Sequence, residues 1–130
     1  MASKNNHDYE RRGLRLSAFI YPNMTIYISI PITGHNLSTQ RAKAAEIAEK
    51  IKALGHTPVN PFDAPEPPGD LSERERYAYF MGEDIKRLLM CDAILMCPRW
   101  QTSKGCKAEF DVAMVYGLKL YSSIDKIPTI

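Results

Sequence analysis

Two acidic residues of the chain occupy helical positions where apolar side chains are expected. With 3.6 residues per turn, Glu109 shares one helix stripe with Cys106, Phe110 and Ala113, and that stripe should pack against a sheet. A carboxyl group that is partly shielded from water has a raised pKa, which suits an acid role. The alternative is that Glu109 lies at the margin of the stripe and reaches solvent.

Asp84 repeats this pattern in the preceding predicted helix. It shares a stripe with Tyr77, Met81 and Leu88, whereas the neighbouring Glu83 points elsewhere and is expected in water. Two carboxyl groups from different helices can work on one substrate only if both helices face the same cleft. The fold must therefore bring the two stripes together.

Alternating predicted strands and helices supply such a fold. Apolar, β-branched runs predict strands at 24–30, 57–60, 93–97 and 118–122. Capping residues and glycine stops predict helices at 39–54, 72–90 and 103–116, with Ser38, Ser72 and Ser103 as N-caps. This order predicts an α/β, flavodoxin-like or Rossmann-like three-layer sandwich around a mostly parallel sheet of four to five strands. Ligands of such sheets bind beyond the carboxyl ends of the strands.

Composition predicts a single domain. A polar, basic stretch at 1–23 is expected to be a mobile N-terminal extension, with a short ordered piece near 14–21, and 24–130 to form the domain. The net charge of +2 and the mixed signs give no support for a nucleic-acid polymer or a membrane surface as partner. No apolar run is long enough to span a bilayer, and the first residues lack a secretory apolar region. We therefore expect a cytoplasmic protein.

The spacing of cysteines and histidines does not suggest a metal site. The three cysteines form no Cys-x-x-Cys pair, and no histidine stands at ligand spacing from them. Neither a dinucleotide-binding glycine pattern nor a P-loop is present. We expect no metal and no cofactor.

Several loop residues are candidates for substrate binding. Thr33, Gly34 and His35 follow the first strand and could wrap a sugar or phosphate, or they could form an ordinary turn. Asn60 and Asp63 follow the second strand and could touch sugar or base, or cap the local turn instead.

Trp100 and Tyr27 are the aromatic candidates for the site. Trp100 follows the third strand and could stack on a base, or pack at a loop or subunit interface. Tyr27 lies in the first strand and could belong only to the core, although its hydroxyl would still need a partner there.

Three segments together resemble the nucleoside 2-deoxyribosyltransferase superfamily, which includes the 2'-deoxynucleoside 5'-phosphate N-hydrolases. Residues 27–34 resemble its first strand and loop, 84–92 its helix-to-strand segment, and 103–117 its catalytic helix, with Ser103, Gly105 and Glu109 at the matching positions. The resemblance covers most of the chain from Met24 to about Tyr121.

The resemblance implies roles for individual residues. Glu109 would act at the anomeric carbon as nucleophile or electrostatic partner, and Asp84 would meet the nucleobase or help to protonate it. Tyr27 would orient Glu109, and Ser103 would contact the 5' end of the sugar. The resemblance also implies a small-molecule nucleoside or nucleotide as substrate and at least a homodimer. The transferases complete their site with a polar residue near a neighbouring C-terminus, and the tail 122–130 offers no clear match.

Ser103 favours a 5'-monophosphate over a free nucleoside. The transferases that use nucleosides tend to carry an aspartate here, which would repel a phosphate, whereas a serine at a helix N-terminus beside Lys104 would accept one. We therefore expect N-glycosidic cleavage by hydrolysis more than base transfer. A nucleotide sensor without turnover and a purely structural domain, in which the two carboxylates only face water, are the alternatives.

Overall fold

The computed structural model describes residues 22–130, and the predicted extension lies almost wholly outside the described residues, as does its expected ordered piece at 14–21. The described chain forms four strands: β1 (Thr25–Ser29), β2 (Thr57–Val59), β3 (Ala93–Met96) and β4 (Lys119–Tyr121). All pair in parallel, in the order β2-β1-β3-β4. The predicted parallel α/β sandwich is confirmed.

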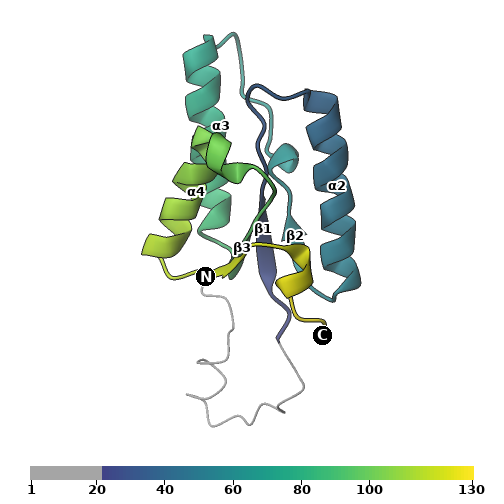
Figure 1. The fold of residues 1–130 in the computed structure, drawn as a ribbon. Helices are drawn as coiled ribbons and strands as arrows, with labels where there is room; N and C mark the ends of the chain where they lie inside the picture. The colour runs from purple at the N-terminus through teal and green to yellow at the C-terminus, as the bar shows by residue number, and fades with distance from the viewer. Residues whose placement is uncertain (1–21) are drawn as a thin grey trace.

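Three helices cover the two faces of the sheet (Figure 1). Helix α2 (Leu37–Ala53) packs on one face, and helices α3 (Glu73–Leu88) and α4 (Lys104–Val115) pack on the other. Alternate residues of β1 divide between the layers, because successive side chains of a strand point to opposite faces. Ile26 and Ile28 join the core beneath α2, and Tyr27 joins the core beneath α3 and α4.

Local sequence signals explain where the helices begin and end. Ser72 and Glu75 form a capping box at the start of α3, and Ser103 caps α4 as predicted. The predicted start of α2 is wrong: Asn36, rather than Ser38, accepts the bond from the Thr39 amide at 2.9 Å, so the helix begins at Leu37.

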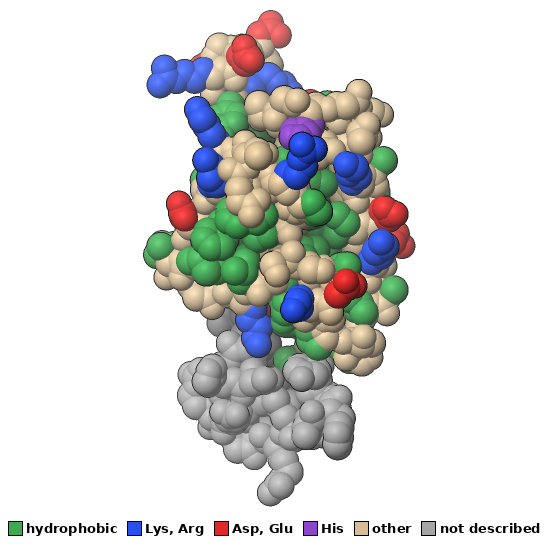
Figure 2. Space-filling model, viewed as in Figure 1, with side chains coloured by type: hydrophobic (Ala, Val, Ile, Leu, Met, Phe, Trp, Pro, Cys, Tyr) green, Lys and Arg blue, Asp and Glu red, His purple; other side chains and the backbone are tan. Residues whose placement is uncertain are grey.

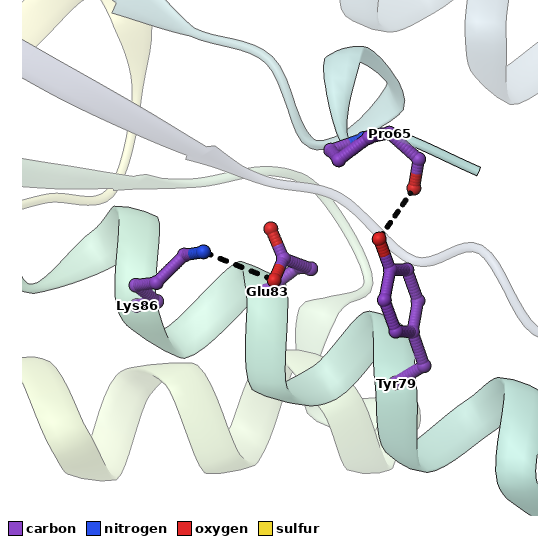
Figure 3. A network of polar contacts seen from close by, with 4 residues as sticks. All are labelled: Pro65, Tyr79, Glu83 and Lys86. Atoms are coloured by element: carbon purple, nitrogen blue, oxygen red, sulfur yellow. Dashed lines mark hydrogen bonds and ion pairs between the residues drawn. The ribbon is translucent and has the colours of Figure 1, made fainter. Parts of the chain in front are cut away.

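The connection between β2 and α3 is long and rich in proline. It contains a short 3-10 turn, η1 (Pro61–Asp63), and then runs without regular structure to Ser72. The Tyr79 hydroxyl of α3 donates to the Pro65 carbonyl at 3.1 Å, while an exposed Lys86–Glu83 pair lies further along the helix (Figure 3). The first of these bonds anchors the loop to α3, close to where the loop borders the site described below.

The strand order reverses direction between β1 and β3. The chain moves outward from β1 to β2, then crosses back to β3 and continues to β4. Open α/β sheets bind ligands at such a switch point, in the crevice beyond the carboxyl ends of the two strands. All three helices begin at this end of the molecule (Figure 1).

Candidate active site

A cavity of about 810 Å³ opens at this switch point. Its walls come from the loop after β1, the start of α2, η1 and the loop after it, and the N-terminal parts of α3 and α4. This volume lies within the range of pockets that hold small organic ligands. Both Asp84 and Glu109 line it, so the two acidic stripes predicted from the sequence meet in one place.

Glu109 lies in the second turn of α4, and its side chain is only 5% exposed. Its Oε2 accepts a 2.8 Å hydrogen bond from the Tyr27 hydroxyl, and its Oε1 accepts a 2.7 Å bond from the Ser29 hydroxyl. Burial raises the pKa of Glu109 to about 7, and the nearby Asp84 contributes in the same direction, whereas the two hydroxyl bonds oppose the rise. Glu109 is thus buried rather than at the solvent margin.

Asp84 is 8% exposed on the facing helix α3. Burial raises its pKa to about 6, while the Arg87 guanidinium and the Tyr27 hydroxyl act in the opposite direction. Arg87 is held by a 2.9 Å bond from its Nη2 to the Asn60 carbonyl. The two carboxyl groups therefore titrate close to neutral pH, one after the other.

Tyr27 sits beneath the cavity rather than in its wall. Its ring is completely buried and its hydroxyl bonds Glu109. Burial and the two nearby carboxyl groups raise the pKa of Tyr27 well above its ordinary value, so its hydroxyl remains a donor. The predicted contact between Tyr27 and Glu109 is present.

The start of α4 brings Ser103, Lys104 and Gly105 into the cavity wall. Ser103 Oγ accepts a 3.2 Å bond from the Cys106 amide, so it caps the helix and still keeps its own proton for donation. A Cβ atom at Gly105 would lie 3.5 Å from Met81 Sδ on α3. A methyl group would therefore make only ordinary van der Waals contacts at this position.

Of the loop candidates, Thr33 lines the cavity, whereas five others do not: Gly34, His35, Asn60, Asp63 and Trp100. The Asn60 side chain accepts a bond from the Phe62 amide, which is the capping role considered as its alternative. The Trp100 ring stacks on Phe110, with centroids 4.8 Å apart. These five residues lie outside the wall of the cavity as it stands.

The structure adds site residues that the sequence reasoning did not single out. Ser29 contacts Glu109, and it could have been found because it faces the same side of β1 as Tyr27, two positions away. Arg41 and Arg76 line the cavity, and their guanidinium groups lie over the Phe62 and Phe80 rings. No local pattern marks these arginines, since their place depends on how the helices pack.

The cavity is bordered by basic side chains. Arg41, Arg76 and Lys104 come from α2, α3 and α4, and Arg76 also approaches Glu66 at 3.6 Å. Basic side chains lie around the end of the molecule where α2 and α3 begin, with acidic side chains among them at the start of α3 (Figure 2). Such a rim attracts anionic ligands.

Comparison with known proteins agrees with this architecture. The search of solved structures finds the 2-deoxyribosyltransferase from the psychrotolerant bacterium Bacillus psychrosaccharolyticus, with a TM-score of 0.57 and 16% identity. The match covers 74% of this chain and 69% of that one. At this identity the likeness shows the fold, and the resemblance expected from the sequence is confirmed at that level.

Over residues 22–130, no helix combines the length and the apolar character that crossing a bilayer requires.

Two further comparisons bear on the family of the chain. No curated protein matches the chain significantly. A family profile does match, over residues 24–122, and its family is described as a domain of unknown function, DUF4406. The chain therefore belongs to the DUF4406 family, and its fold is that of the nucleoside 2-deoxyribosyltransferase-like proteins.

Proposed function

We propose that this protein cleaves the N-glycosidic bond of a nucleoside 5'-monophosphate, or of a nucleoside, with a ribose or deoxyribose sugar. The observation that carries the proposal is the meeting of Asp84 and Glu109 in one cavity, with Glu109 bonded to the Tyr27 hydroxyl at 2.8 Å. Cleavage of a glycosidic bond needs one group near the anomeric carbon and one acid near the leaving group. Because the pKa of Glu109, about 7, lies above that of Asp84, about 6, the form with Glu109 ionised and Asp84 protonated is a minor form that is most populated between the two values.

In the proposed reaction, the bond between C1' and the base nitrogen breaks and its electron pair leaves with the base. Asp84 gives its proton to the departing base. Ionised Glu109 stabilises the positive charge on the sugar, or captures C1' as an ester that water then opens. Water adds to C1' and releases the proton that restores the acid form of Asp84, so the net reaction consumes one water molecule.

The start of α4 supports a 5'-phosphate as part of the substrate. Ser103 has a hydroxyl proton to donate, Lys104 supplies positive charge, and the first amides of the helix are available beside them. Water would then be the acceptor of the sugar in place of a second base, as the tail at 122–130 lacks a clear counterpart of the residue that transferases contribute. We also propose that the protein forms a homo-oligomer, because its resemblance to the nucleoside 2-deoxyribosyltransferase superfamily implies at least a dimer.

The direct test is base release from a panel of nucleosides and 5'-monophosphates, followed by chromatography. Wild-type protein should free the base from at least one monophosphate, and Glu109→Ala should not. Release that is undiminished in Glu109→Ala would overturn the proposed mechanism.

The second candidate is a nucleotide sensor of the same fold without turnover. The observation that favours it is the pKa of Glu109, about 7, which leaves a large share of this carboxyl protonated and unreactive at neutral pH. Saturable binding of a monophosphate, with no base released between pH 5 and 9 in a roughly day-long incubation at micromolar enzyme, would favour the sensor.

A further inference from the structure

The geometry points to Ser29 as a second positioning residue of the site, one that holds Glu109 in a single orientation and favours its charged form. Ser29 is completely buried, and its hydroxyl donates to Oε1 of Glu109 at 2.7 Å while Tyr27 occupies Oε2. Both carboxyl oxygens are therefore held by donors from one strand. The inference rests on the proposed function of Glu109, and it adds a residue whose role that function does not require.

The position of Ser29 on β1 places its hydroxyl on the same side of the strand as that of Tyr27. Residues two apart on a strand face the same side, roughly 7 Å apart along the chain. The long Tyr27 side chain and the short Ser29 side chain thus approach the carboxyl group from two directions. The backbone that carries both donors is held in the sheet, because β1 pairs with β3 through Ser29 and with β2 as far as Tyr27.

The two donors offset the penalty that burial imposes on the carboxylate. Hydrogen bonds to an ionised group favour that form, while burial and the neighbouring Asp84 favour the protonated form. Without the Ser29 hydroxyl, Oε1 would lose its donor at a site from which solvent is largely excluded. Glu109 would then be protonated over a wider pH range, and the group proposed to act at the anomeric carbon would be available less often.

The other ionisable groups near Glu109 come from every element that packs around it. The Cys106 thiol interacts with the Ser29 hydroxyl and with Glu109, and the remaining groups are Tyr27 of β1, Asp84 and Arg87 of α3, Lys104 of α4 and Cys97 after β3. Among the described residues, the donors to Glu109 are the two hydroxyls of β1. Loss of the Ser29 hydroxyl removes one of these two donors and also its interaction with the Cys106 thiol.

The experiment compares Ser29→Ala and Ser29→Cys with Ile28→Val. The alanine variant removes the donor, and the cysteine variant keeps the side-chain volume but supplies only a weak donor. Ile28→Val is the matched control, because it trims a fully buried neighbour on the same strand that faces the opposite layer. The side-chain carboxyl of Glu109 is titrated by 13C NMR in protein labelled at glutamate, with Glu109→Gln used to assign the signal.

Ser29→Ala should raise the pKa of Glu109 by about one unit, and Ser29→Cys should raise it nearly as far. Ile28→Val should leave it unchanged. At pH 7 a one-unit rise from about 7 lowers the ionised fraction roughly five-fold. We expect kcat at pH 7 to fall by about that factor and KM to change much less, with the optimum of the pH–rate profile displaced to higher pH.

Three results would overturn the inference: an unshifted Glu109 titration in Ser29→Ala, full restoration by Ser29→Cys, or an equal shift in Ile28→Val. Should Ser29→Ala fail to fold, Ser29→Cys carries the comparison. Failure of the proposed function has a separate sign, since the wild type would then release no base from any substrate. The NMR titration needs no turnover and would still decide the role of Ser29.

Discussion

The Tyr27 hydroxyl donates a 2.8 Å hydrogen bond to Oε2 of Glu109, joining residues 82 positions apart. The bond ties the central strand β1 to the second turn of α4, beneath the cavity that Asp84 borders from α3. Together with the bond from Ser29, it holds the orientation of a carboxyl group whose charged form burial disfavours.

Loss of the Tyr27 hydroxyl should lower turnover without unfolding the protein. Tyr27→Phe keeps the buried ring and removes only the donor to Glu109, so we expect a roughly 10- to 100-fold drop in kcat with the fold retained. Steady-state kinetics with the best substrate of the panel measures the drop, and circular dichroism checks the fold. Tyr121→Phe, a change on the edge strand β4, is the control and should leave kcat unchanged.

The rate of base release should show a bell-shaped dependence on pH. Release needs Glu109 ionised and Asp84 protonated, and the pair titrates with pKa values of about 7 and about 6. We expect kcat/KM to be greatest between these values and to fall on both sides. Asp84→Asn should remove the fall in rate on the alkaline side, which reflects deprotonation of Asp84. The same variant should slow the release of poor leaving groups more than that of good ones. A flat profile from pH 5 to 9 would contradict the assigned roles.

Stability should decrease as the pH rises through the titration of Glu109. Its pKa is raised in the folded state, so the folded protein binds the proton more tightly than the unfolded chain does. The stabilising effect is complete below the ordinary pKa of a glutamate and is lost as the pH approaches about 7. Glu109→Gln removes the buried charge, so we expect it to raise the free energy of unfolding by about 1–3 kcal/mol at pH 8 and by much less at pH 5. Urea unfolding of both proteins at pH 5 and pH 8 measures the difference. An equal change in the free energy of unfolding at the two pH values would show that it does not come from the titration of Glu109.

An aspartate at position 103 should reverse the preference for a phosphate. Aspartate is as good an N-cap as serine, so Ser103→Asp should keep α4 intact while placing a negative charge at the start of the helix. We expect kcat/KM for a 5'-monophosphate to fall at least ~10-fold and that for the matching nucleoside to change far less. Ser103→Asn is the uncharged capping control. An equal fall in kcat/KM for the monophosphate and the nucleoside would indicate that the phosphate does not bind at Ser103.

Neutralising Lys104 should weaken binding of the monophosphate in a manner that depends on salt. Lys104 lines the cavity at the start of α4, and a Lys104→Met variant keeps most of the apolar stem while removing the charge. We expect KM for the monophosphate to rise about 3- to 10-fold at low ionic strength and to approach the wild-type value in high salt. Lys107→Met, one turn further along α4, is the control and should have little effect.

Much of the fold follows from local sequence patterns. The apolar runs that became β1 and β3, the capping serines 72 and 103 and the alternation of strand and helix lead directly to a parallel sheet with helices on both faces. Helix α2 began two residues earlier than expected, because an asparagine and a serine stand near each other and only the packed helix selects one of them as its cap.

In the candidate site too, local sequence patterns identify some residues, and the packing of the elements adds the others. Residue type and helical period marked Asp84 and Glu109 in advance, because a charged group on an apolar face stands out within a single element. The bond from Ser29, the arginines at the rim and the place of Trp100 against Phe110 depend on how separate elements approach one another. The sequence by itself determined which residues could carry acid–base chemistry. Only the tertiary structure decided which side chains reach them, since contacts between elements depend on packing distances that no local period encodes.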